Sequence, residues 1–240
     1  MVSRVVSVAL IAASLGLLVP LSVQAQASGR LLVVNKAGQS LSVVDLAEGR
    51  ETARVPTGHA PHEVAVSPDG ETAVVTNYGT RDRPGNTLTV VDLGTLEPSA
   101  TIDLGDQLRP HGIVWLPGTS RVAVTTEGSG TLTVVDVAAR KVVAAVPTSQ
   151  RISHQVSVTP EGSRAFVANI GSGSVTVIDL EAMKAVQSIP TGDGAEAVAV
   201  APGGTEVWVT NRAENTVTVL DTRSLRSEEH TSELQSLLII

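Results

Sequence analysis

The sequence predicts an all-β fold, a β-propeller built from four-stranded antiparallel blades. Short runs of Val, Ile and Thr are separated by Gly, Pro, Asn and Asp, which is typical of strands joined by tight turns, and no segment after the N-terminus has a helical period. One strand end also recurs at intervals of 47, 44, 43 and 42 residues, and a fixed period of this length indicates a repeat architecture. The five copies are Val44-Asp45, Val91-Asp92, Val135-Asp136, Ile178-Asp179 and Leu220-Asp221.

Each repeat is expected to contribute strands A to D of one blade. In the second repeat they are Glu63–Ser67, Thr72–Asn77, Thr87–Leu93 and Ala100–Leu104, with a turn at residues 68–70. Four to five blades are predicted within residues 26–225. They are a first blade with strands B to D in 30–57, complete blades in 61–104, 110–147 and 153–190, and a partial fifth blade in 195–221. A two-layer sandwich is the alternative, but its strands would not normally repeat in this way.

A short motif recurs in the second strand of the blades, as Val75-Thr76-Asn77-Tyr78, Val167-Ala168-Asn169 and Val209-Thr210-Asn211. Two further motifs accompany it, Asn86-Thr87-Leu88-Thr89-Val90-Val91-Asp92 and Val66-Ser67-Pro68-Asp69-Gly70. Over residues 30–225 the chain resembles the YVTN family of β-propeller repeats. The resemblance implies a seven-bladed complete protein and, in many members, an extracytoplasmic location. It implies no single activity, because the family ranges from surface-layer and binding proteins to a few enzymes.

The N-terminal 25 residues are typical of a cleaved secretory signal peptide. Arg4 supplies a short positive region, residues 5–21 are almost wholly apolar, and Val23-Gln24-Ala25 ends in small residues. The apolar run is short for a membrane span and contains Pro20. We therefore expect a periplasmic or secreted protein with no membrane span after cleavage.

The C-terminal segment is predicted to be non-native. Residues 226–236 coincide with the first-frame translation of a common short-read sequencing adapter, so residues 226–240 are interpreted as read-through of library DNA. The alternative is a genuine polar C-terminal helix, for which Ser, Glu, Leu and Gln are suitable.

Composition excludes several functions. A net charge of −7 without a basic stripe, together with 2% aromatic residues, argues against nucleic-acid binding. The chain has no cysteine, which leaves no disulfide, haem attachment site or iron–sulfur cluster, and no glycine-rich loop for a nucleotide occurs.

Histidine recurs at the start of strand A. His62, His111 and His154 occupy the same position in three repeats, and Glu196 occupies it in the next. Strand A is the innermost strand of a propeller blade, so these side chains are expected near the channel mouth. Imidazole and carboxylate groups bind divalent transition metals, which makes the three histidines candidate metal ligands. The alternative is structural: each histidine would bond backbone groups of its own turn.

The loop at residues 78–86 is longer than its counterparts and is expected on the same face. Arg81 and Arg83 could bind an anionic ligand there, although an ordinary solvated loop with an ion pair to Asp82 is the alternative. The repeated aspartates that end strand C are instead assigned to turn formation, because a carboxylate there accepts from backbone N–H groups two residues on.

Two functions remain open. The first is an exported binding or interaction platform with its protein or small-molecule partner at the channel mouth. The second is a propeller enzyme, such as a lactonase, a lyase or a metal-dependent oxidoreductase, that uses the same histidines.

Overall fold

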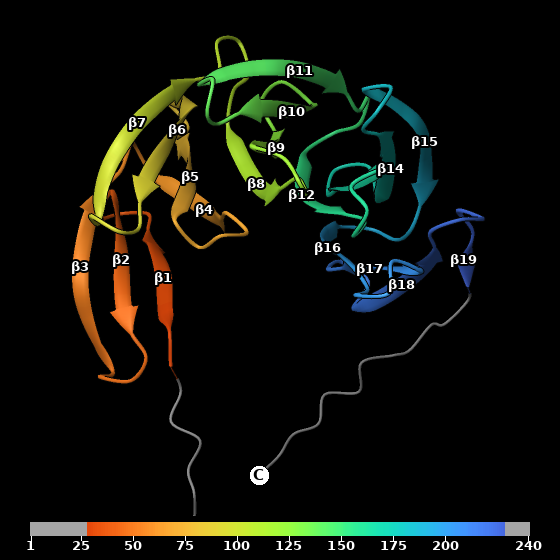
Figure 1. Ribbon diagram of the computed structural model, residues 1–240. Coiled ribbons are helices and arrows are strands. Elements are labelled where there is room, and N and C mark those ends of the chain that lie inside the picture. Colours follow the sequence, from red (N-terminus) through yellow and green to blue (C-terminus); the bar gives the residue numbers. More distant parts are fainter. Residues whose placement is uncertain (1–27, 229–240) are drawn as a thin grey trace, which may run out of the picture.

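The computed structural model describes residues 28–228, which form five antiparallel β-sheets and no helix. Figure 1 shows the sheets arranged side by side in an arc around a central space. The first sheet has three strands and the other four have four each. The predicted all-β propeller class is confirmed.

Residues 28–228 form nineteen strands. The first two sheets contain β1 (Arg30–Asn35), β2 (Ser40–Asp45) and β3 (Arg50–Pro56), then β4 (Pro61–Val66), β5 (Thr72–Gly79), β6 (Pro84–Asp92) and β7 (Glu97–Asp103). The third and fourth contain β8 (Pro110–Trp115), β9 (Arg121–Thr126), β10 (Thr131–Asp136) and β11 (Lys141–Pro147), then β12 (Ser153–Val158), β13 (Arg164–Asn169), β14 (Ser174–Asp179) and β15 (Lys184–Pro190). The fifth contains β16 (Ala195–Val200), β17 (Glu206–Asn211), β18 (Thr216–Asp221) and β19 (Ser227–Glu228).

The expected signal peptide and residues 229–240 of the expected non-native tail lie outside the described residues. Within the described part, Ser227 and Glu228 pair with Leu220 and Val219 of β18 and so add a short fourth strand to the fifth sheet.

The hydrophobic core lies between the sheets. Four clusters of buried apolar residues each join two consecutive sheets, for example Leu132 and Val134 of β10 with Val167 of β13. Strand residues alternate between the two faces of a sheet, and here both faces are apolar because each inner sheet packs against a neighbour on either side. The inner strands β4, β8, β12 and β16 are thereby brought next to one another (Figure 1).

The repeated aspartates form turns, as predicted. Asp45 Oδ1 accepts from the N–H groups of Ala47 and Glu48, and Asp179 Oδ1 accepts from those of Glu181 and Ala182, at 2.8 to 2.9 Å. Each carboxylate closes the hairpin between the third and fourth strands of its blade.

Each complete blade has a β-bulge in its first strand, at the position where histidine or Glu196 recurs. In β8 the pairing passes from Pro110–Thr126 directly to Ile113–Val124, so that His111 and Gly112 together oppose Thr125. A bulge leaves an N–H without a ladder partner and re-aims the side chain beside it. The Gly112 N–H donates instead to Thr125 Oγ1 at 2.8 Å, and the Thr125 hydroxyl donates to the carbonyl oxygen of His154 in the next sheet at 2.5 Å.

Thr125→Val is expected to lower the free energy of unfolding by about 1–3 kcal/mol, because the Gly112 N–H and the His154 carbonyl both lose a buried partner while side-chain shape is retained. Thr125 is fully buried. Urea unfolding followed by tryptophan fluorescence measures the difference. Thr101→Val is the matched control, because Thr101 is an exposed residue of β7. Equal effects of the two substitutions would contradict a role for the Thr125 hydroxyl.

Candidate functional site

Three histidines from adjacent inner strands stack on one another. The ring centroids of His62 (β4) and His111 (β8) are 3.9 Å apart, and those of His111 and His154 (β12) are also 3.9 Å apart. The bulges place each ring at the start of its strand, and the packing of the sheets brings the three rings together. We call these residues the histidine stack.

His111, the middle member of the stack, is held neutral. It is only 3% exposed. Burial lowers the pKa of His111 from 6.5 to about 3, with further lowering by the charges of His154, His62 and Lys36. A neutral imidazole retains a nitrogen lone pair, so His111 remains able to bind a metal ion far below neutral pH.

Two carboxylates complete two groups of potential metal ligands. Within residues 28–228 the groups are His62, Glu63 and His111, and His111, Glu127 and His154. In each group the ligand atoms lie within 4.8 Å of one another. His111 belongs to both, so the stack presents two overlapping ligand sets.

The second group is oriented by hydrogen bonds from outside it. His154 Nδ1 lies 3.2 Å from the carbonyl oxygen of Glu196, which makes Nδ1 the donor and leaves Nε2 as an acceptor. Glu127 Oε2 accepts from the Tyr78 hydroxyl at 2.5 Å, which leaves Oε1 free. The two free atoms, His154 Nε2 and Glu127 Oε1, are 3.8 Å apart. Two ligand atoms about 2.1 Å from one tetrahedral ion are about 3.4 Å apart, so a small contraction would suffice.

The first group is less completely oriented. Glu63 Oε1 accepts from Gln155 Nε2 at 3.1 Å and lies 3.7 Å from His62 Nδ1. The Nδ1 atoms of His62 and His111 are buried and have no hydrogen-bond partner in the described chain. Buried polar atoms without a partner are costly, and a bound ligand would satisfy them.

The other predicted site residues lie apart from the stack. The Glu196 carboxylate forms an ion pair with Arg212 at 3.0 Å, and only its backbone carbonyl contacts His154. Arg81 lines a pocket together with Tyr78, whereas Arg83 does not line it. Neither arginine forms an ion pair with Asp82 or with any other residue between 28 and 228.

The structural alternative predicts a bond from each histidine to backbone groups of its own turn. His154 instead bonds the carbonyl of Glu196, which belongs to the next sheet. This contact joins two blades at their inner strands.

Sequence reasoning missed Glu63, Glu127 and Tyr78 as members of the site. A signal was present at the position directly after the predicted end of the second strand of each blade. The residues there are Lys36, Tyr78, Glu127, Ile170 and Arg212, most of them large and polar. Three of these side chains contact one another: Lys36 Nζ lies 5.1 Å from the Tyr78 ring centroid, and the Tyr78 hydroxyl donates to Glu127. Arg212 instead binds Glu196, outside the stack. Aligning the repeats at this position would have found a second row of residues beside the histidines.

The sheets define the class of this protein, which is an all-β protein of the propeller type. No protein-family model and no curated protein matches the chain. Among solved structures it is similar to hydrazine synthase of Kuenenia stuttgartiensis, with a TM-score of 0.62 and 20% identity over 80% of this chain and 73% of that chain. It is also similar to a functionally unknown protein from Desulfotomaculum acetoxidans DSM 771, with a TM-score of 0.70 and 19% identity over 82% of this chain and 64% of that one.

At this level of identity the two structures show that they share the fold of this chain, and they show nothing about its activity. Residues 28–228 contain no helix long and apolar enough to cross a membrane.

Proposed function

We propose that this protein is an exported β-propeller that serves as a binding platform, with a divalent transition-metal ion held at the channel mouth. The observation that carries the proposal is the group formed by His111, Glu127 and His154. Its ligand atoms converge within 4.8 Å although they come from two different sheets. Imidazole and carboxylate together suit Zn²⁺ and Cu²⁺.

The hydrogen bonds around this group favour a metal site over simple packing. The carbonyl of Glu196 fixes the tautomer of His154, and the Tyr78 hydroxyl orients Glu127. Metal-binding histidines commonly donate their second ring nitrogen to a carbonyl or carboxylate in this manner. His154 and Glu127 are 16% and 10% exposed, so an ion here would be largely shielded from water but still reachable.

We expect chelator-treated protein to bind one Zn²⁺ ion per chain, measured by isothermal titration calorimetry. His154→Ala removes a ligand and should lower the affinity at least tenfold, and Glu127→Gln should act in the same direction. Glu63→Gln is the matched control, because it changes a carboxylate of the other group and leaves the proposed ligands intact. His59→Ala controls for nonspecific binding to histidine outside the stack.

Two results would overturn the metal proposal. One is the absence of zinc binding in protein shown to be folded by circular dichroism. The other is equal loss of affinity in Glu127→Gln and Glu63→Gln, which would place the ion elsewhere. If His154→Ala changes stability without any metal effect, the stack has a packing role.

The second candidate is a propeller enzyme of the lactonase, lyase or metal-dependent oxidoreductase kind. One observation favours it: Tyr78 contacts Glu127 and also lines the neighbouring pocket, so a bound molecule could lie near the ion. Turnover of a lactone panel by zinc-loaded protein, abolished in His154→Ala, would support this candidate over the platform. Binding of zinc without turnover would support the platform.

Export and membership in the YVTN family are parts of the same proposal. The N-terminal 25 residues support export, and Val-Thr-Asn at residues 75–77 and 209–211 together with Pro-Asp-Gly at residues 68–70 supports the family. Mass spectrometry of protein from the periplasm of a bacterial host tests export, because cleavage after Ala25 gives a defined mass. Retention of the uncleaved chain in the cytoplasm would contradict it.

A further inference from the structure

A pocket of about 480 Å³ lies beside Tyr78, between the first two blades. Three segments supply its walls: residues 36–39 between β1 and β2, residues 59–60 between β3 and β4, and residues 78–81, which end β5 and begin the loop after it. Ala37, Ala60 and Gly79 leave part of the lining apolar. We call it the Tyr78 pocket. Its volume falls in the range that holds small organic ligands.

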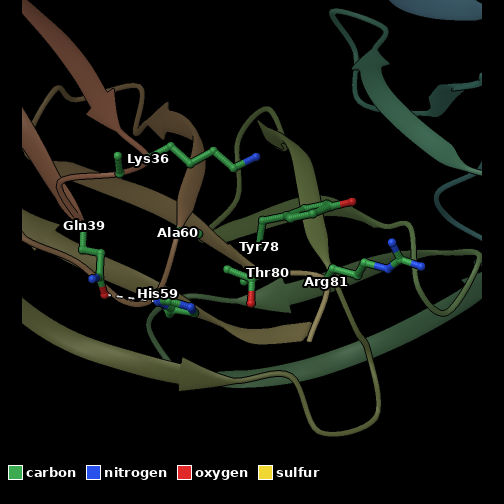
Figure 2. A pocket seen from close by; sticks show the side chains of 9 residues that line it. Lys36, Gln39, His59, Ala60, Tyr78, Thr80 and Arg81 are labelled. Atoms are coloured by element: carbon green, nitrogen blue, oxygen red, sulfur yellow. Dashed lines mark hydrogen bonds between the residues drawn. The ribbon is translucent and has the colours of Figure 1, made fainter. Parts of the chain in front are cut away.

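The charge of the Tyr78 pocket is opposite to that of the whole chain. Lys36 and Arg81 line it, and no Asp or Glu does, although the chain has a net charge of −7. In Figure 2, Lys36 and Arg81 extend on either side of the Tyr78 ring. Neither cation forms an ion pair with another described residue, so both charges remain available to a ligand.

The loop that carries Arg81 is held in place by its backbone. Gly79 has a φ of +78°, and a Cβ there would come within 2.3 Å of the Arg83 carbonyl oxygen, so only glycine fits. The Thr80 N–H donates to that same oxygen at 2.9 Å, and Arg109 Nη2 donates to the Arg81 carbonyl at 3.1 Å. A loop fixed in this way loses little conformational entropy when a ligand binds.

The opposite wall is also fixed. His59 Nδ1 and Gln39 Oε1 lie 3.3 Å apart and join the turn after β1 to the loop before β4, as the dashed line in Figure 2 indicates. The pocket therefore has two anchored walls, an aromatic ring, an apolar lining and two unpaired cations.

We propose that the Tyr78 pocket binds a small organic anion whose carboxylate lies between Lys36 and Arg81. The guanidinium of arginine offers a planar pair of donors that matches a carboxylate, and lysine adds a point charge. The apolar lining and the Tyr78 ring suit an organic body of the ligand. None of the proposed metal ligands lines this pocket, although Tyr78 borders both sites through its hydrogen bond to Glu127.

The test uses benzoate as the probe, with benzamide as its neutral isostere, on the full chain after chelator treatment. Isothermal titration calorimetry should show benzoate binding at least tenfold more tightly than benzamide. Arg81→Ala and Lys36→Ala should each weaken benzoate binding about tenfold, because each removes a charge-assisted contact. Inorganic phosphate, which lacks an organic body, should bind more weakly than benzoate.

Arg83→Ala is the matched control, because Arg83 lies in the same loop and does not line the pocket. Equal losses in Arg81→Ala and Arg83→Ala would overturn the proposal and indicate nonspecific attraction of anions. Equal binding of benzoate and benzamide, or of benzoate and phosphate, would also overturn it. Because the metal is removed, the benzoate result does not depend on the outcome of the zinc experiment. His154→Ala protein, which lacks a proposed zinc ligand, should bind benzoate with the wild-type affinity.

Discussion

Acidification from pH 7 to pH 5 is expected to lower the free energy of unfolding by about 2 kcal/mol through His111 alone. The pKa of His111 is lowered to about 3 in the folded protein, mainly by burial, and its ordinary value is 6.5. Between these values the unfolded chain binds a proton that the folded protein does not. Stability is therefore complete above pH 6.5 and is lost progressively as the pH falls toward 3, with a slope of up to about 1.4 kcal/mol per pH unit.

Measuring between pH 7 and pH 5 separates the contribution of His111 to the free energy of unfolding from the contributions of the surface carboxylates. The pKa values of Asp69 and Asp92 lie below their ordinary value of 3.8, because Asp69 accepts a hydrogen bond from Ser67 and Asp92 accepts one from the backbone of Thr95. Protonation of these carboxylates also lowers the free energy of unfolding, but only at a lower pH than the one at which His111 begins to act. Urea unfolding of metal-free protein at pH 7, 6 and 5 measures the slope.

The variant that tests this assignment is His111→Phe, which keeps a ring in the buried position and removes the titrating group. Its unfolding free energy should vary less between pH 7 and 5 than that of the wild type. His59→Gln, outside the histidine stack, should retain the wild-type slope. Identical slopes in wild type and His111→Phe would contradict the assignment, whatever the absolute stability of the variant.

Gly112→Ala is expected to destabilise the protein by about 1–3 kcal/mol and to weaken zinc binding. A Cβ at Gly112 would lie 2.7 Å from the carbonyl oxygen of His154 and 3.0 Å from the Cα of Gln155. Both atoms belong to the backbone of β12, so the strand itself must move. That movement displaces His154 from the rings beside it, so the spacing of the proposed metal ligands changes together with the packing.

The matched control is Gly203→Ala. Gly203 is exposed, and the nearest atom to a Cβ there is Thr205 Oγ1 at 3.9 Å, an ordinary contact. Urea unfolding and zinc titration of the two variants should separate a local clash from a general effect of replacing glycine. Gly112→Ala protein with wild-type stability and wild-type zinc affinity would show that the bulge tolerates a side chain and that the close approach of β12 has no functional role.

Much of the fold could be predicted because its signals are local. The aspartate that ends each third strand makes its hydrogen bonds within three residues, so Asp45 and Asp179 could be assigned to turns from their position alone. The strands can likewise be recognised locally. Successive side chains of a strand point to opposite faces of the sheet, and because both faces are buried, apolar residues occur on both faces rather than at every second position only. Strand number and order in each blade follow from these two patterns.

The site depends on contacts between residues far apart in the chain. Glu196 occupies the repeat position of the histidines, yet Arg212 binds its carboxylate and removes it from the candidate ligands. Glu127 is 27 residues before His154 and belongs to a different sheet, and it becomes a candidate ligand because the two sheets pack together. The bulge that aims each histidine adds one residue to a strand without altering its apolar pattern, so periodicity does not reveal it.

The sequence by itself determined the repeated blade, its turns and the recurrence of one histidine at the start of the first strand, because each of these depends on residues close together in the chain. Tertiary structure alone decided that the three rings stack at 3.9 Å, that Glu127 and Tyr78 join them, and that Lys36 meets Arg81 around a common pocket. The physical reason is that the rotation and spacing of neighbouring sheets are set by the packing of side chains between them, and that packing brings together residues from separate repeats.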